Sequence, residues 1–120
     1  MAKVKYSPEA NKDLATTKSY IENDLKNPVA AERILYRILS KNRLLETAPK
    51  IGTPLSSIIG IETEYRFLIS GNYLSFYRYV ENDNTCYIDR VLYIRRNYLA
   101  ILFSKSHEPE TDENDEEIGE

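Results

Sequence analysis

Hydrophobic positions along the chain change their spacing near residue 50, from the period of a helix to the alternation of a strand. Before this point, apolar residues recur every three or four positions, which predicts two amphipathic helices. After it, roughly residues 62–94 are rich in the Tyr, Phe, Ile, Val and Leu that strands favour. The pattern therefore predicts an α+β fold in which a helical pair precedes a small sheet.

Both predicted helices begin with a capping residue followed by proline. Ser7 precedes Pro8, and Asn27 precedes Pro28. Ser and Asn side chains accept a free N–H of the first turn, and proline fits the first helical position. Pro28 also ends the first helix, because the residue before a proline avoids the helical region. We expect an antiparallel helical hairpin with a very short connection, preceded by a short strand over the alternating residues 3–6.

The second half of the chain predicts three antiparallel strands joined by two turns. Gly71-Asn72 is a two-residue hairpin signal, and residues 82–85 form a second turn. Residues 97–103 are compatible with a short helix or an extended segment. The expected order is therefore β-α-α-β-β-β, with the helical hairpin packed on an antiparallel sheet. The three strands are predicted over about 64–70, 73–81 and 86–94.

The first turn also predicts the register of its hairpin. It places Ser70 opposite Tyr73 and Arg66 opposite Tyr77, and a four-residue second turn places Arg90 opposite Tyr77. We expect the open face of the sheet to present the row Arg66–Tyr77–Arg90, although a slip of one residue would turn the third strand over. The opposite, apolar face is expected to cover the helices. It comprises Phe67, Ile69, Leu74, Phe76 and Val80.

Two groups of basic residues are candidates for binding. Guanidinium groups interleaved with tyrosines suit phosphate contact and base stacking, whereas the simpler interpretation pairs them with nearby acids such as Asp89. A second group, Arg33, Arg37 and Lys41, recurs every four residues on the second helix. It is typical of a solvated helix face, with a partner or nucleic-acid surface as the functional alternative. The first group comprises Arg66, Arg78, Arg90, Arg95 and Arg96.

Composition excludes several kinds of chemistry. The single cysteine, Cys86, excludes an intramolecular disulfide and a cysteine-rich zinc site, and the single histidine, His107, lies among acids near the C-terminus. We therefore expect no metal, no cofactor and no Ser/His or Cys/His catalysis. No apolar run approaches a membrane span, and residues 1–6 do not resemble a secretory signal. These features predict a cytoplasmic protein without a membrane partner.

Charge divides the chain into two parts. Residues 105–120 contain eight acids and one base, so residues 1–104 carry a net charge of +4 although the whole chain carries −3. A block of like charges without aromatic residues does not bury enough surface to fold. We predict one domain over 1–104 and a disordered acidic tail over 105–120. The tail is interpreted as a solubilising extension or as a shield that weakens contact with nucleic acid.

Several motifs resemble the RelE/ParE superfamily of toxins from bacterial type II toxin–antitoxin systems. The hairpin Gly-Asn-Tyr-Leu-x-Phe-Tyr-Arg over 71–78 and the strand end Arg-Val-Leu-x-x-Arg-Arg over 90–96 carry most of the resemblance. The opening Tyr-Ser-Pro-Glu-Ala and the Pro-x-x-Gly-x-Pro loop are also similar. The resemblance covers residues 3–103. It implies the strand, helical hairpin and three-stranded sheet described above.

The resemblance also implies a partner and a target. It implies growth arrest by the free toxin, a cognate antitoxin, and binding of operator DNA only through that antitoxin. RelE-like toxins cleave mRNA in the ribosomal A site, whereas ParE-like toxins poison DNA gyrase. At positions where the nuclease branch places basic residues, this chain has Leu74 and Leu68, with matches at Arg66 and Arg96 and an ill-spaced C-terminal aromatic, Tyr98. The hairpin is more similar to the ParE branch, which favours DNA gyrase or another non-nuclease mode.

Three functional hypotheses follow. In the binding version, the residues that contact a target are Arg66, Tyr77, Arg90, Arg95 and Arg96. In the enzyme version, a metal-independent endoribonuclease acts on ribosome-bound mRNA: Arg66 and Arg96 neutralise phosphate, Tyr98 assists proton transfer, and the mRNA 2′-hydroxyl attacks. In the third, the chain is an inactive member that retains antitoxin binding and operon regulation.

Overall fold

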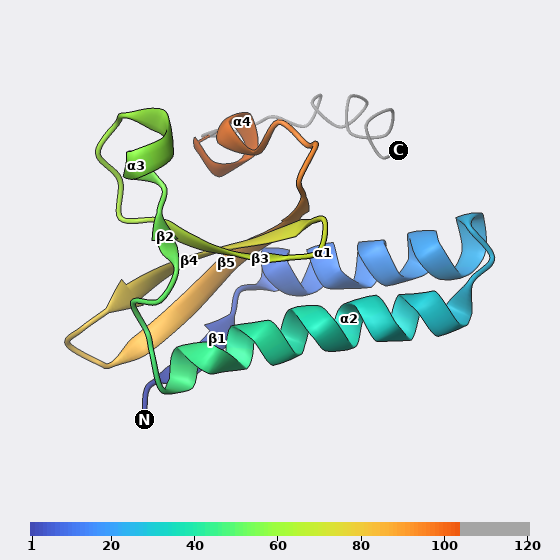
Figure 1. The fold of residues 1–120 in the computed structure, drawn as a ribbon, viewed down its shortest axis with the longest axis horizontal. Coiled ribbons are helices and arrows are strands. Elements are labelled where there is room, and N and C mark those ends of the chain that lie inside the picture. The colour runs from blue at the N-terminus through green and yellow to red at the C-terminus, as the bar shows by residue number, and fades with distance from the viewer. Residues whose placement is uncertain (104–120) are drawn as a thin grey trace.

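The computed structural model describes residues 1–103 and confirms the α+β class (Figure 1). A five-stranded sheet in the order β1-β5-β4-β3-β2 separates the helical hairpin from two short helices. The predicted disordered tail, 105–120, lies outside the described residues. The elements are β1 (Lys3–Tyr6), α1 (Pro8–Ser19), α2 (Pro28–Arg43), β2 (Thr53–Pro54), α3 (Ser56–Ile59), β3 (Arg66–Ser70), β4 (Tyr73–Val80), β5 (Thr85–Tyr93) and α4 (Tyr98–Phe103).

Both predicted helix caps are confirmed. The Ala10 N–H donates to Ser7 Oγ at 2.9 Å, and the Ala30 N–H donates to Asn27 Oδ1 at 3.1 Å. Each cap satisfies one of the N–H groups that the first turn leaves without a helical acceptor. A π-helical turn over Tyr20–Asp24 extends α1 to the connection. The two helices therefore start where the Ser-Pro and Asn-Pro pairs predict.

The sheet is mixed because the first strand joins it in parallel. β1 pairs with β5, with Lys3 opposite Thr85 and Tyr6 opposite Ile88. The three strands of the C-terminal half pair antiparallel, as the turn signals predict. The register of the β3–β4 hairpin is also confirmed, since Ser70 lies opposite Tyr73. Local turn chemistry thus determined this hairpin, whereas the parallel partner of β1 lies some eighty residues away.

The predicted row Arg66–Tyr77–Arg90 is wrong. Arg66 does lie opposite Tyr77, but Tyr77 lies opposite Ile88, and Arg90 lies opposite Phe76. The second turn falls one residue earlier than predicted, because Val80 pairs with Thr85. The register then shifts between Phe76 and Tyr77, which leaves Asp89 as an extra residue on β5. A bulge of this kind bends a strand and re-aims the side chains beside it.

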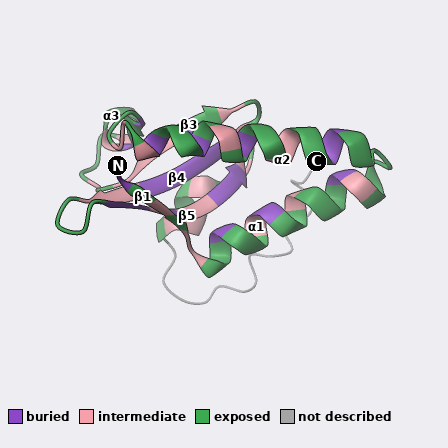
Figure 2. Ribbon diagram, turned by 90° about the horizontal axis from the view of Figure 1, so that it is seen from below, coloured by how far each residue is buried: buried purple, intermediate pink, exposed green. Residues whose placement is uncertain are grey.

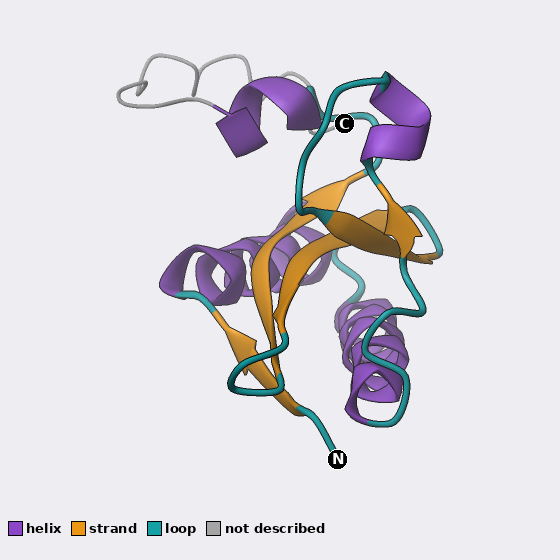
Figure 3. Ribbon diagram, turned by 90° about the vertical axis from the view of Figure 1, so that its left-hand side faces the viewer, coloured by secondary structure: helices purple, strands orange, loops and turns teal. Residues whose placement is uncertain are grey.

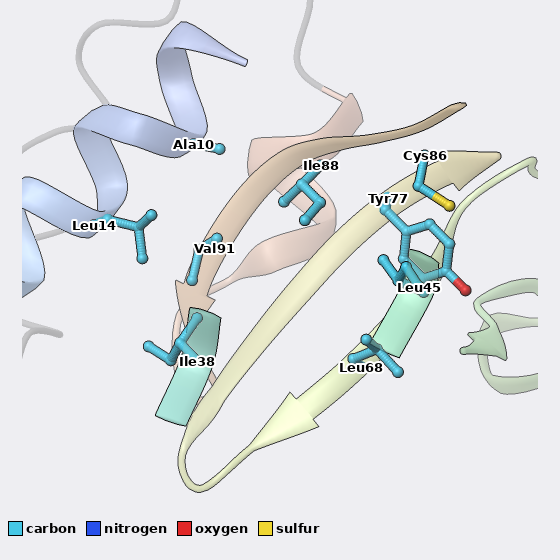
Figure 4. Close-up of a cluster of buried hydrophobic side chains, with 9 residues drawn as sticks. All are labelled: Ala10, Leu14, Ile38, Leu45, Leu68, Tyr77, Cys86, Ile88 and Val91. Carbon is cyan, nitrogen blue, oxygen red and sulfur yellow. The ribbon is translucent and has the colours of Figure 1, made fainter. Parts of the chain in front are cut away.

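The face predicted to be open is the face that the helical hairpin covers (Figure 4). Leu68, Tyr77 and Ile88 point into the same core as Ala10 and Leu14 of α1 and Ile38 of α2. Tyr77 has no exposed surface. The prediction failed because both faces of the sheet are largely apolar, so alternation alone did not identify the side that meets the helices.

The other face of the sheet has a smaller core beneath α3 and α4 (Figure 3). Leu74, Phe76 and Leu92 are buried there against Leu55, with Tyr98 of α4 packed on the cluster. Figure 2 shows that the exposed positions follow the outer sides of α1 and α2. Within residues 1–103, no helix has the length and hydrophobicity to cross a bilayer.

Candidate partner-binding face

The face of the sheet between α3 and α4 contains an apolar groove. Its volume is about 290 Å3. Three isoleucines on its walls remain between 40% and 58% exposed, namely Ile58, Ile69 and Ile94. Exposed apolar surface of this kind is a common property of protein–protein interfaces. The groove is lined by Ile58, Phe67, Ile69, Leu74, Phe76, Ile94 and Tyr98.

The groove exists because the two short helices cover only part of this sheet face. Leu55 is fully buried at the start of α3, whereas Ile58, one turn later, is largely exposed. On α4, Tyr98 stacks near Phe76, with ring centroids 5.2 Å apart, while Leu99 and Phe103 stay partly exposed. The groove is therefore an exposed apolar surface next to the smaller core, of the kind that an apolar segment of another protein covers.

Two arginines of the sheet, Arg78 and Arg90, form ion pairs with carboxylates of the same chain. Arg90 forms two hydrogen bonds of 2.8 Å with the carboxylate of Asp13 on α1, which also accepts the Val91 N–H at 2.9 Å. Arg78 Nε donates to Asp89 Oδ2 at 2.8 Å, and its guanidinium lies 5.6 Å from the centre of the Tyr87 ring. For these two arginines, the structure favours the simpler interpretation, in which they form ion pairs.

Asp89, the extra residue of the bulge, organises a small polar cluster. The Asp89 carboxylate accepts a hydrogen bond from Arg78 and another, at 3.0 Å, from the hydroxyl of Tyr65. Burial of the Tyr65 ring and, next, the charge of Asp89 raise the pKa of Tyr65 to about 12. Both effects disfavour the phenolate. The tyrosine therefore remains a hydrogen-bond donor well above neutral pH.

Arg66 and Tyr77 hold the loop over residues 49–52. Arg66 Nη1 donates to the carbonyl of Gly52 at 2.8 Å and to that of Lys50 at 3.1 Å. The Tyr77 hydroxyl accepts the Gly52 N–H and donates to the Pro49 carbonyl, both at 2.9 Å. A Cβ on residue 52 would lie 2.6 Å from the Tyr77 ring, which explains glycine at this position. Tyr77 is thus a structural residue with a buried side chain, and its predicted contact with a target stays a prediction.

The predicted site residues fall at two ends of the sheet. Arg66 and Tyr77 lie at one end of the β3–β4 hairpin, whereas the Ile94 N–H meets the Asn72 carbonyl at the other. Arg95 and Arg96 follow Ile94 at this second end, where Arg95 is exposed and Arg96 is half-buried. Tyr98 lines the groove beside them. The structure therefore separates Arg66 from Arg96 along the sheet. The Tyr98 ring packs on Phe76, in the core on the opposite side of the sheet from Tyr77.

Sequence reasoning missed Asp13, which binds Arg90, and Ile58, which lines the groove. Asp13 was not considered, because a single acid on a helix carries no signal of a partner on a distant strand. The run Ser-Ser-Ile-Ile-Gly-Ile over 56–61 did carry a signal, since isoleucines in a short loop segment are unusual unless they pack or bind. Within residues 1–103, no three His, Cys, Asp or Glu side chains converge on a metal-sized site.

Two solved structures share the fold of this chain. In the chromosomal ParDE toxin–antitoxin system from P. aeruginosa, a solved chain superposes with a TM-score of 0.65 at 18% identity, covering 78% of this chain and 97% of that one. A chain of the RelBE2 toxin–antitoxin complex from Mycobacterium tuberculosis superposes with a TM-score of 0.54 at 22% identity, covering 77% and 96%. No curated protein matches the chain. At these identities, what the chain shares with both structures is the fold.

The sequence identifies the family. The family described as the ParE toxin of the type II toxin–antitoxin system, parDE, matches residues 4–98. The chain therefore belongs to the ParE toxin family, and the resemblance to the RelE/ParE superfamily is confirmed.

Proposed function

We propose that this toxin arrests growth by a mode other than mRNA cleavage and that DNA gyrase is its favoured target. The separation of Arg66 from Arg96 carries the proposal. Arg66 is the first residue of the five-residue strand β3 and lies opposite Tyr77 of β4. Arg96 lies beyond the other end of β3, where Ile94 bonds to Asn72. At about 3.3 Å per residue, the strand alone spans roughly 16 Å. Phosphoryl chemistry needs its cationic groups around one phosphate.

The side chains at the remaining nuclease positions support the same proposal. Leu74 and Leu68 are 5% and 6% exposed, and each belongs to one of the two cores. Arg66 Nη1 is occupied by two backbone carbonyls. The Tyr98 ring packs on Phe76 in the groove. Two of the side chains matched to the nuclease branch, Arg66 and Tyr98, thus have structural partners of their own.

We further propose that a cognate antitoxin binds the apolar groove. The two structures of similar fold come from toxin–antitoxin systems, and the exposed isoleucines of the groove provide the apolar centre that a stable interface needs. To test this, Ile69→Ser/Ile94→Ser would be co-expressed with the protein encoded beside the toxin gene. We expect loss of co-purification and of growth rescue. Val29→Ser/Tyr36→Ser, two exposed apolar residues on α2, is the matched control and should retain both.

The target is tested by two assays after induction without antitoxin. Purified gyrase with the toxin should lose supercoiling activity or accumulate cleaved DNA, and primer extension on cellular mRNA should show no new ends. Codon-phased mRNA cuts with unaffected gyrase would overturn the proposal in favour of the ribosome-dependent endoribonuclease. Normal growth without antitoxin would instead indicate an inactive member that keeps only antitoxin binding.

A further inference from the structure

Helix α2 carries a row of cations that differs from those of the sheet. Arg33, Arg37 and Lys41 are all exposed, and among residues 1–103 none of them makes an ion pair or a side-chain hydrogen bond. Glu32 is the one acid within α2. The row therefore has no internal counter-charge comparable to Asp13 or Asp89.

The N-terminal part of this row borders a cavity. Arg33 and Arg37 line a hollow of about 220 Å3 together with Ser70 and the β3–β4 turn. Arginine and serine side chains and the backbone of a turn carry hydrogen-bond donors of the kind that bind phosphate. The cavity and the row together make a site that is separate from the apolar groove. It is lined by Arg33, Ile34, Arg37, Ser70, Gly71, Asn72 and Tyr73.

We propose that this row binds the phosphate backbone of duplex DNA, with one phosphate seated in the cavity. At about 1.5 Å per residue, the row from Arg33 to Lys41 is roughly 12 Å long. Since one DNA strand carries a charge every 3.4 Å or so along the helix axis, this length matches about three or four phosphates. The proposal does not depend on gyrase as the target.

Duplex DNA fits the surface better than a single strand does. Proteins that bind single strands combine a basic groove with several aromatic side chains on which bases stack. Along α2, Tyr36 is the one exposed aromatic residue, at 72%. The surface is therefore rich in phosphate contacts and poor in stacking positions, so we expect binding without sequence preference and with a strong dependence on salt.

The test compares full-length variants of equal charge. Arg33→Gln/Arg37→Gln/Lys41→Gln removes the row, and Lys3→Gln/Lys5→Gln/Lys12→Gln removes three exposed lysines of β1 and α1. Binding of a short fluorescent DNA duplex is measured by anisotropy over a range of salt concentrations. Each phosphate contact contributes about 0.9 to the slope of log K against log salt, so loss of the row should lower the slope by about 2.7. That difference is about 40-fold in affinity for a fourfold change in salt.

The control should leave the slope unchanged, with both variants showing wild-type circular dichroism and melting. An equal fall in slope for the control would mean diffuse attraction and would overturn the proposal, as would an absence of wild-type binding at low salt. Duplex RNA and polyglutamate are measured in parallel. Row-dependent binding that is tighter to either of them would overturn the assignment to DNA. If the toxin binds duplex DNA through the row but has no effect on gyrase, the proposed gyrase target is wrong and the DNA-binding proposal stands.

Discussion

The arginines of the sheet and the cations of α2 are chemically alike but have different surroundings. Arg66, Arg78 and Arg90 each bind a carboxylate or backbone carbonyl that a distant segment provides. Arg33 and Arg37 have no such partner among the described residues and border an open cavity. A basic residue in a sequence is therefore a binding candidate only when the fold leaves it without an internal acceptor.

The difference follows from where the fold places acids. Asp13 on α1 and Asp89 in the bulge each lie beside a strand arginine, in partly buried positions where an unpaired charge would be costly. The outer side of α2 is solvated, so its cations are stable without partners. The predictions below test this comparison, beginning with the largest expected effect.

Asp13→Asn should destabilise the fold by about 3 kcal/mol, because it leaves the half-buried Arg90 without its counter-charge and weakens the bond to the Val91 N–H. Urea unfolding measures the loss. Asp24→Asn removes an exposed carboxylate near the end of the same helical segment and should change stability by less than about 0.5 kcal/mol. Equal effects of the two substitutions would mean that the Arg90 pair contributes no more than a surface charge.

Gly52→Ala should cost about 1–3 kcal/mol, since the new methyl group would overlap the Tyr77 ring and the Phe67 carbonyl. It would loosen the loop that Arg66 and Tyr77 hold. Thermal melting provides the measurement, with the exposed neighbour Thr53→Ala as the control. A wild-type melting temperature for Gly52→Ala would show that the loop is free to move, which would release Arg66 to act as a binding residue.

The polar cluster at Asp89 predicts a pH dependence. Because the pKa of Tyr65 is raised to about 12 by burial and by Asp89, the folded protein holds this proton more tightly than the unfolded chain, whose tyrosines have a pKa near 10. The free energy of unfolding should therefore fall as the pH rises from about 10 to 12. Tyr65→Phe should show a smaller fall in chemical denaturation over this window. Parallel curves for the two proteins would contradict the raised pKa of Tyr65.

Arg37→Gln should have the smallest effect, within about 0.5 kcal/mol of wild type, because its guanidinium has no partner to lose among the described residues. Arg90→Gln in the same urea assay should be clearly less stable. A marked destabilisation by Arg37→Gln would show that α2 uses this arginine structurally, and the contrast between the two groups of cations would disappear.

Much of the candidate site was inaccessible to sequence reasoning. The arginines and the acceptor Asp89 were identified, but Asp13 was not, because the Arg90–Asp13 ion pair joins residues 77 positions apart. The groove was missed because its isoleucines belong to elements that are short and far apart in the chain. The stripe on α2 was found from its spacing alone, since helical periodicity is a local property.

The sequence by itself determined the helix starts at Ser7-Pro8 and Asn27-Pro28, the order of the longer helices and strands, and the register of the hairpin at Gly71-Asn72. Each of these depends on interactions between residues a few positions apart. Only the tertiary structure decided which sheet face meets the helices, where β1 pairs and how the bulge at Asp89 re-aims Arg90. Both faces of the sheet are apolar enough to be buried, so the choice depends on packing among all the elements at once.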